Sequence, residues 1–325
     1  MKKIELSCID LFAGCGGLSL GLEQAGFTPI FVNELTPDAM NTYLRNRLDK
    51  YPWLSQNKVH DVKTLVQDPS ILDSLLEDSS RQFGITDVDL LVGGPPCQGY
   101  SGIGHRRSYG VEREQLPSNH LYQDMAYVIH RIRPKIFMFE NVRGLLNARW
   151  TKAGEKHEIW EDVKATLSDI PGYRFKHALV FAKDYGVPQN RPRVLGVGIR
   201  EDIKFDSSSG VAGGHLPTGL GGYPSINELL SDLVDPDYLS GPSLKYPNSA
   251  SSKVQKDLRS DPETNRVRGK NSPLSEQEYS KHSDKIVSKF EYMIANDGEI
   301  PDNMRTKKFA QRVLPKQWGS GGPNI

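Results

Sequence analysis

An apolar strand, a glycine turn and an apolar helix follow one another at the start of this chain. Residues 4–12 (IELSCIDLF) are mostly apolar, as a strand covered on both faces requires. Glycines crowd residues 14–17, and residues 18–25 continue as an apolar helical run. This order predicts a strand that turns tightly into a helix, which is the first unit of an α/β sheet.

The same alternation continues over about the first 200 residues. Apolar side chains at helical spacing predict one helix between residues 121 and 132 and another between 159 and 170. Further strands are expected at residues 30–34, 58–62, 89–94, 135–142, 177–182 and 193–200. Strands that alternate with helices predict an α/β fold with a mostly parallel sheet and helices on both faces.

The character of the chain changes after about residue 200. Residues 207–215 (SSSGVAGGH) and 218–224 (TGLGGYP) are rich in turn-forming residues, and residues 240–275 lack clear periodicity. We therefore expect a sheet domain over residues 1–205 and a second, mostly irregular region over residues 206–325.

The second region is also the more basic one. Residues 241–325 contain 15 Lys and Arg against 10 Asp and Glu, whereas the rest of the chain contains 26 against 30. A basic tail on a mildly acidic body favours contact with a polyanion. A solvated surface explains the same charge equally well.

The cysteines exclude two ways of stabilising a fold. The chain has three cysteines, at positions 8, 15 and 97, and no two of them have CxxC spacing. Neither a disulfide framework nor a structural zinc site is expected, and we predict no metal site. The N-terminus carries no long apolar run, so neither a signal peptide nor a membrane span is predicted. These features favour the cytoplasm.

The glycine turn resembles a nucleotide-binding turn. Gly14, Gly16 and Gly17 would let the backbone approach a ligand closely at a helix N-terminus. Glu34 lies 20 residues after Gly14, at the end of the second expected strand, where its carboxylate can accept from ribose hydroxyls. Asp61 ends the third expected strand and could meet an adenine amino group. A tight turn and a helix-capping aspartate remain the alternatives.

The stretch GGPPCQGYS at residues 93–101 follows an apolar strand. It is therefore expected at the carboxyl edge of the sheet, where open α/β sheets bind their ligands. Prolines fix φ and stiffen the loop that carries Cys97, which suits a nucleophile whose position matters. The alternative is a buried structural cysteine.

Two later motifs supply an acid and two arginines. Glu140 ends the strand at 135–142, next to the cysteine loop if the two strands are neighbours. Its carboxyl group can act as a general acid, or it can be a salt-bridge partner. Arg191 and Arg193 are two residues apart at the start of a strand, so both are expected to point the same way.

In this order, the motifs resemble the DNA (cytosine-5)-methyltransferase family. The matching stretches are DLFAGCGGLSLGL (10–22), GGPPCQGYS (93–101), FENVRGLL (139–146) and YGVPQNRPRVLGVG (185–198), with Glu34 and Asp61. The resemblance implies a Rossmann-like methyltransferase fold and S-adenosylmethionine as the cofactor. It also implies transfer of a methyl group to carbon 5 of cytosine in double-stranded DNA, in a bacterial restriction-modification system.

The resemblance also implies roles for single residues. Cys97 would attack the base, Glu140 would contact N3 and the amino group of the cytosine, and Arg193 would contact its O2 and steady Glu140. Glu34 would hold the ribose of the cofactor and Asp61 its adenine. The cofactor would also be bordered by Phe12, Gly14, Gly16, Gly17 and Pro95, while Gln98, Ser101, Asn141, Gln189 and Arg191 would line or support the site.

The segment after the cysteine, residues 101–120, is long and contains several glycines and arginines. We interpret it as a mobile loop that closes on DNA through Arg106 and Arg107. The alternative is a disordered insertion.

The end of the chain departs from the family. The family's final RxxxRxQ-type and GNxV-type elements are not visible before the sequence ends at WGSGGPNI, so residues 206–325 look like the start of a target-recognition region. We expect either a second polypeptide that supplies these elements or a longer chain. Two other functions stay open, a non-catalytic regulatory or DNA-binding relative and a tRNA cytosine-5 methyltransferase.

Overall fold

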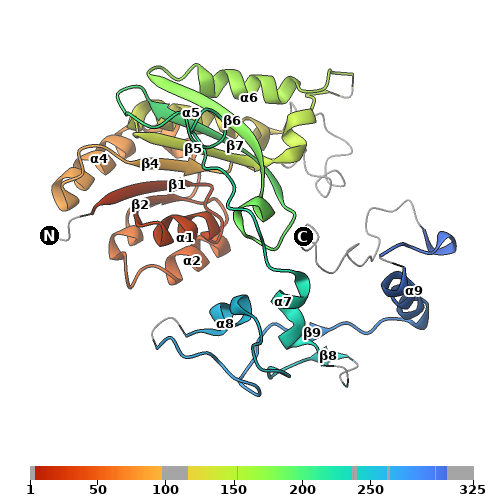
Figure 1. Cartoon of the computed structure of the whole chain (residues 1–325). Coiled ribbons are helices and arrows are strands. Elements are labelled where there is room, and N and C mark those ends of the chain that lie inside the picture. The colour runs from red at the N-terminus through yellow and green to blue at the C-terminus, as the bar shows by residue number, and fades with distance from the viewer. Residues whose placement is uncertain are drawn as a thin grey trace. The chain divides into compact units, whose positions relative to one another are not determined.

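A computed structural model describes residues 4–96, 116–151, 153–235, 237, 240–261, 264–296 and 298–305 (Figure 1). The chain divides into two compact units. The first comprises Met1–Val180 and Pro192–Thr218, and the second Phe181–Arg191 and Gly219–Ile325. The domain boundary expected at residue 205 therefore stays a prediction, because the second unit also takes in an earlier segment.

The first unit is built on a seven-stranded sheet. Its strands are β1 Leu6–Leu11, β2 Phe27–Asn33, β3 Lys58–Val59, β4 Leu90–Gly93, β5 Ile136–Val142, β6 Tyr173–Phe181 and β7 Pro192–Arg200, in the order β3-β2-β1-β4-β5-β7-β6. The pairs β1–β2, β1–β4, β2–β3 and β4–β5 are parallel, and β5–β7 is antiparallel. The expected α/β fold with a mostly parallel sheet is confirmed.

Helices cover both faces of this sheet. The α-helices are α1 Gly17–Gln24, α2 Pro37–Arg45, α3 Lys63–Gln67, α4 Ser70–Phe83, α5 Leu121–Ile132 and α6 Glu158–Ser168. Short 3₁₀ helices of this unit are η1 Pro52–Ser55, η4 Pro117–His120 and η5 Arg143–Asn147, whereas η6 Ala182–Tyr185 belongs to the second unit. Figure 1 shows α1 and α2 on one side of the sheet and α5 and α6 on the other.

The strands are apolar throughout because each face has its own helices. Along β4, Leu91 joins the cluster that contains the buried residues of α5 and α6. Its neighbours Leu90 and Val92 point the other way and pack with Leu18 and Leu22 of α1. Helix α5 ends at Arg133, which adopts a left-handed conformation directly before Pro134, where the sequence predicted its end.

The second unit has short elements and a charged centre. Its elements are α7 Ile226–Leu230, η7 Ser231–Leu233, β8 Gly241–Pro242, α8 Lys253–Arg259, β9 Glu278–Tyr279, α9 Asp284–Ala295 and η8 Asp302–Met304. Ser225 and Ser252 begin α7 and α8 with capping boxes. Helices α7 and α8 thus begin at capping boxes, which a search for apolar periodicity in the sequence does not detect.

Arg259 is the most extensively bonded charged side chain among the described residues of the second unit. It forms a buried ion pair with Asp232 at 3.0 Å and donates to the carbonyls of Arg268 and Gly269, each at 2.8 Å. Its guanidinium also lies 3.7 Å from the centre of the Tyr246 ring. All three side-chain nitrogens of this arginine donate hydrogen bonds inside the unit. Among the described residues, no helix is long and apolar enough to cross a membrane.

Candidate functional site

The ends of four neighbouring parallel strands lie level at one edge of the sheet. Leu11 at the end of β1 pairs with Asn33 of β2 and with Gly93 of β4, and Gly93 pairs with Phe139 of β5. The motif residues follow directly after these positions. The topology therefore brings the glycine turn, the glutamate after β2, the proline loop and the glutamate of FENV to a single edge, the carboxyl edge of the sheet.

The glycine turn needs left-handed backbone at alternate residues. Phe12, Gly14 and Gly16 have φ angles of 58°, 56° and 89°. A Cβ on Gly16 would lie 2.5 Å from Nη1 of Arg47, whereas nothing lies within 4 Å of a Cβ on Gly14 or Gly17. Gly14 is thus required for its backbone angle, and Gly16 for its angle and for the close approach of Arg47.

Glu34 fixes the glycine turn to the end of β2. Its Oε2 accepts a hydrogen bond from the Gly14 amide at 2.8 Å, and its Oε1 accepts one from the Thr36 amide at 2.7 Å. A carboxylate offers about four acceptor sites, so these two bonds leave others for a ligand. The side chain that the sequence proposed for ribose binding therefore also shapes the turn.

Asn33 is a further residue of this edge, and the sequence motifs did not single it out. It is buried, and its Oδ1 accepts from the Phe12 amide at 3.2 Å. Its Nδ2 donates to the carbonyls of Val59 and His60 at 3.0 and 2.8 Å. One amide side chain thereby ties together the ends of β1, β2 and β3. The only sequence signal is a polar residue at the end of an apolar strand.

A cavity of about 420 Å³ opens at this edge. Its lining includes Phe12, Glu34 and Asp61, together with the apolar side chains of Val62 and Leu121. Asp61 lies two residues beyond β3, which is shorter than expected, and its carboxylate accepts from the Lys63 amide at 3.0 Å. The structure thus gathers three of the proposed cofactor residues around one cavity of the size that small-molecule sites have.

Glu140 and Arg193 form an ion pair beside the proline loop. The Nε of Arg193 lies 2.6 Å from Oε1 of Glu140, and the side chains are 21% and 32% exposed, respectively. A Cβ on Gly94 would lie 2.9 Å from Oε2 of Glu140. The absence of a side chain at Gly94 therefore provides the space that the carboxyl group of Glu140 occupies. The expected contact between Arg193 and Glu140 is present, and the pair is open enough to meet a ligand.

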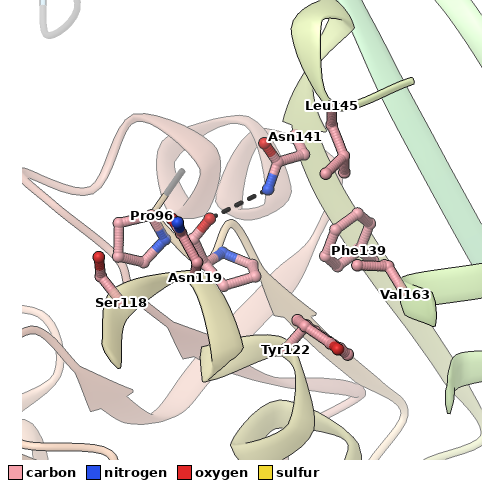
Figure 2. Close-up of a pocket in the computed structure, with 9 residues that line it drawn as sticks. Pro96, Ser118, Asn119, Tyr122, Phe139, Asn141, Leu145 and Val163 are labelled. Atoms are coloured by element: carbon pink, nitrogen blue, oxygen red, sulfur yellow. Dashed lines mark hydrogen bonds between the residues drawn. The ribbon is translucent and has the colours of Figure 1, made fainter. Parts of the chain in front are cut away.

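Asn141 anchors the proline loop to β5. Its Nδ2 donates to the carbonyl of Pro95 at 3.0 Å, and its Oδ1 accepts from the Val142 amide at 2.9 Å. Figure 2 shows the first bond as a dashed line, next to a small pocket lined by Pro96 and Asn119. Asn141 and Pro95 are both buried. These contacts support a role in holding the loop, whereas contact of Asn141 with DNA stays a prediction.

Several proposed site residues cannot be placed beside this edge. Cys97, Gln98, Ser101, Arg106 and Arg107 lie outside the described residues. Gln189 and Arg191 belong to the second unit, and β7 begins only at Pro192. Strand β7 contains Arg193 but not Arg191, so the alternation of side chains along a strand does not relate the two. The expectation that they point the same way therefore stays a prediction.

The other two cysteines differ in their surroundings. Cys8 is buried in β1, and this burial raises the pKa of its thiol far above the ordinary value. It therefore remains a neutral thiol of low reactivity. Cys15 lies in the glycine turn and is exposed. Neither thiol is in a disulfide among the residues that the structure describes.

Asp10 is a buried carboxyl group directly beneath the glycine turn. It is 1% exposed, and the hydroxyl of Ser19 donates to its Oδ2 at 2.5 Å. The same hydroxyl lies 2.8 Å from that of Tyr43. Burial raises the pKa of Asp10 from 3.8 to about 7, although the Ser19 hydrogen bond and the charge of Arg47 oppose this. The carboxyl group therefore titrates close to neutral pH.

This titration is expected to make stability depend on pH. Between about pH 4 and 7 the folded protein keeps a proton on Asp10 that the unfolded chain has lost, so the free energy of unfolding falls as pH rises. The slope would reach about 1.4 kcal/mol per pH unit and flatten above pH 7. Urea unfolding of wild type and Asp10→Asn at several pH values measures the difference. The variant should lack this slope, and parallel profiles would contradict the prediction.

The comparison with known families identifies the family of this chain. A family model described as C-5 cytosine-specific DNA methylase matches residues 6–318. The chain belongs to this family. The methylase motifs that carried the resemblance in the sequence are thus part of a match that includes both units.

Curated relatives of this chain are Type II methyltransferases. M.DdeI from Desulfomicrobium norvegicum is 31% identical over 255 residues, which cover 78% of this chain and 55% of the relative. M1.HphI from Haemophilus parahaemolyticus is 34% identical over 237 residues, covering 71% and 56%. The chain spans about half the length of the curated relatives it matches.

A solved structure supports the fold of this chain. It is a putative DNA modification methyltransferase encoded within an E. coli prophage, with a TM-score of 0.53 and 23% sequence identity. The match covers 77% of this chain and 61% of that one. The expected Rossmann-like methyltransferase fold is confirmed.

Proposed function

We propose that this chain transfers a methyl group from S-adenosylmethionine to carbon 5 of a cytosine in double-stranded DNA. The observation that carries the proposal is the placement of the Glu140–Arg193 pair against the proline loop, at the edge that also holds the cavity with Glu34 and Asp61. The relatives' names add that such an enzyme serves in restriction-modification. A cytoplasmic location, expected from the cysteines, belongs to the same proposal.

The cavity fits S-adenosylmethionine in size and in chemistry. About 420 Å³ lies within the range of roughly 300–1,000 Å³ that small-molecule sites occupy. Glu34 has acceptor positions left for ribose hydroxyls, and the exposed carboxylate of Asp61 can accept from an adenine amino group. Val62 and Leu121 supply apolar wall for the adenine ring. When bound, the cofactor supplies the methyl group that carbon 5 accepts.

The protein's own residues prepare the base for that transfer. The Cys97 thiolate adds to carbon 6 of cytosine, while Glu140 delivers a proton to N3, so electron density moves to carbon 5. After carbon 5 has gained the methyl group, its proton is lost to water. Expulsion of the thiolate and return of the N3 proton to Glu140 then restore the aromatic ring. Arg193 holds Oε1 of Glu140, which leaves Oε2 for the base. A base inside a duplex is hidden from a thiolate, so the cytosine must first be flipped out.

Transfer of tritium from labelled S-adenosylmethionine tests this function. Mixed-sequence duplex DNA and a tRNA pool compete for the label, and duplex DNA with 5-fluorocytosine is used to trap the covalent adduct. We expect label in the duplex and a trapped adduct. Label in tRNA would instead support the tRNA methyltransferase, and absence of both products would support the non-catalytic relative.

A second polypeptide, or further residues of the same chain, is part of this proposal. The basis is the family comparison, in which the matched relatives extend well beyond the matched region. Adding a polypeptide with the family's RxxxRxQ-type and GNxV-type elements is expected to raise turnover. Equal turnover by residues 1–325 alone would contradict this part.

A basic arm in the second unit offers contacts for DNA phosphates. Arg266, Arg268 and Lys270 are exposed, and none of them forms an ion pair with a carboxylate of the described residues. Val267 lies between the two arginines and forms an antiparallel bridge with Ser260, so the arm pairs with the end of α8. The buried Arg259 holds the arm at its base through the carbonyls of residues 268 and 269. A row of exposed cations that is held at its base suits a DNA backbone.

Changing the three cations of this arm to glutamine is expected to weaken DNA binding equally for all sequences. Each lost phosphate contact would lower the slope of log K against log salt by about 0.9. Fluorescence anisotropy at several salt concentrations measures the slope. The control is Lys253→Gln on α8, whose ammonium pairs with Asp257 at 2.6 Å and whose loss should leave the slope unchanged. An unaltered slope in the triple variant would refute a role of the arm.

A further inference from the structure

Arg47 is buried next to the glycine turn, although it belongs to none of the sequence motifs. It lies two residues beyond the end of α2 and is 6% exposed. Its Nη2 donates to the carbonyl of Gly16 at 2.8 Å, and its Nε lies 2.6 Å from Oε1 of Glu23 in α1. Its guanidinium also stacks 4.1 Å from the centre of the Tyr43 ring. One side chain thus connects α2, α1 and the turn.

The turn needs such support because its backbone is unfavourable. Three of the five residues from Phe12 to Gly16 have positive φ, and Phe12 carries a bulky side chain in that region. Backbone of this kind persists only where the surrounding structure determines it. Glu34 holds the turn at the Gly14 amide, on the side of the cavity. Arg47 holds the same turn at the carbonyl of Gly16.

The contact between Arg47 and Gly16 is specific for arginine and glycine. A Cβ on residue 16 would lie 2.5 Å from Nη1 and 2.9 Å from the central carbon of the guanidinium. The planar group therefore packs flat against the Cα of Gly16 while it bonds the carbonyl. Lysine ends in a compact ammonium group and cannot reproduce the planar fork that reaches the carbonyl, Glu23 and the Tyr43 ring from separate positions.

We propose that Arg47 is a positioning residue that holds the glycine turn in the shape that binds S-adenosylmethionine. The inference rests on the proposed function, because the cofactor is part of it. The carboxylate of Glu23 neutralises the charge of Arg47. The pair therefore affects the ligand through the shape of the glycine turn and not through its own electric field. Loss of the arginine should loosen the turn and lower cofactor affinity, while the distant Glu140 site keeps its arrangement.

The variants separate this role from general stability. Arg47→Met in a Glu23→Gln background removes the anchor without leaving a buried carboxylate unpaired, which on its own would be strongly destabilising. Glu23→Gln alone keeps the bond from Arg47 to Gly16. Arg47→Lys tests partial rescue. The control is Arg45→Met, which removes an exposed arginine in the last turn of α2.

Three measurements decide the proposal. Calorimetry with S-adenosylmethionine should show a dissociation constant about 10- to 100-fold higher in the double variant, which is about 1.4–2.7 kcal/mol. Glu23→Gln and Arg45→Met should stay close to wild type, and Arg47→Lys should fall between. Amide hydrogen exchange should speed up at Ala13 and Gly16, whose amides donate to Asn33 and Ala13, but not in β4 or β5. At saturating cofactor, turnover should be nearly restored.

An unchanged dissociation constant in the double variant would overturn the proposal. So would faster exchange throughout the sheet, because Arg47 would then be a general stabilising residue. If wild type binds no S-adenosylmethionine, the proposed function fails instead. Local exchange at Ala13 and Gly16 still decides in that case whether Arg47 holds the turn.

Discussion

Replacing Cys97 by alanine is expected to abolish methyl transfer while cofactor binding stays nearly unchanged. The thiolate acts on the base and not on the cofactor, so its loss removes the covalent route to an electron-rich carbon 5. Transfer of tritium and calorimetry with S-adenosylmethionine measure the two effects separately. The exposed Cys15 provides the matched control, because Cys15→Ala should still form an adduct with 5-fluorocytosine DNA.

Two results would count against this role of Cys97. One is a loss of cofactor affinity of tenfold or more, which is about 1.4 kcal/mol. The other is an adduct that forms without the thiol. The described part of the loop supports the expectation, because the Pro95 carbonyl is held by Asn141 two residues before the cysteine. A nucleophile gains from such a fixed starting point.

Changing Glu140 to glutamine is expected to slow covalent addition by about 10²–10⁴-fold, the range for a positioned proton donor. Glutamine keeps the volume that lies against Gly94, and its oxygen can still accept from Arg193. It cannot deliver a proton to N3. DNA binding should therefore change little, because the folded shape of the site remains.

The rate of adduct formation with 5-fluorocytosine DNA measures this effect, and anisotropy measures DNA binding. Glu161→Gln is a suitable control, since Glu161 is an exposed residue of α6 that pairs with Lys164. An adduct rate equal to that of wild type would remove Glu140 from the mechanism. Equal losses of rate and binding would make it a residue that only holds DNA.

The sequence predicted the carboxyl edge of the sheet because its motifs are local. The glycine turn and the proline loop each follow an apolar strand, FENV ends another, and parallel strands end at one edge. The direction of β7 was open, because an apolar segment looks the same whether it pairs parallel or antiparallel with β5. The helices α2 and α4 were missed, although their apolar faces are real.

The supporting residues were not predictable for a different reason. Arg47 meets Gly16 across 31 residues, and Asn33 meets the backbone of β3 from the end of β2. No pattern of residue spacing in the sequence identifies an arginine whose side chain becomes buried in the folded protein. Arg259 is a second case, because it lies in a polar stretch without periodicity and becomes the buried centre of its unit. Such contacts follow from the assembled fold and not from the local sequence.

The lack of a side chain at residue 94 has a consequence for the Glu140–Arg193 pair. The nearest atom to a Cβ there would be Oε2 of Glu140, at 2.9 Å. A methyl group in this position would push the acid away from its partner Arg193. The atom that must move is the far end of a flexible side chain, so Gly94→Ala should leave the fold intact and act on this ion pair alone.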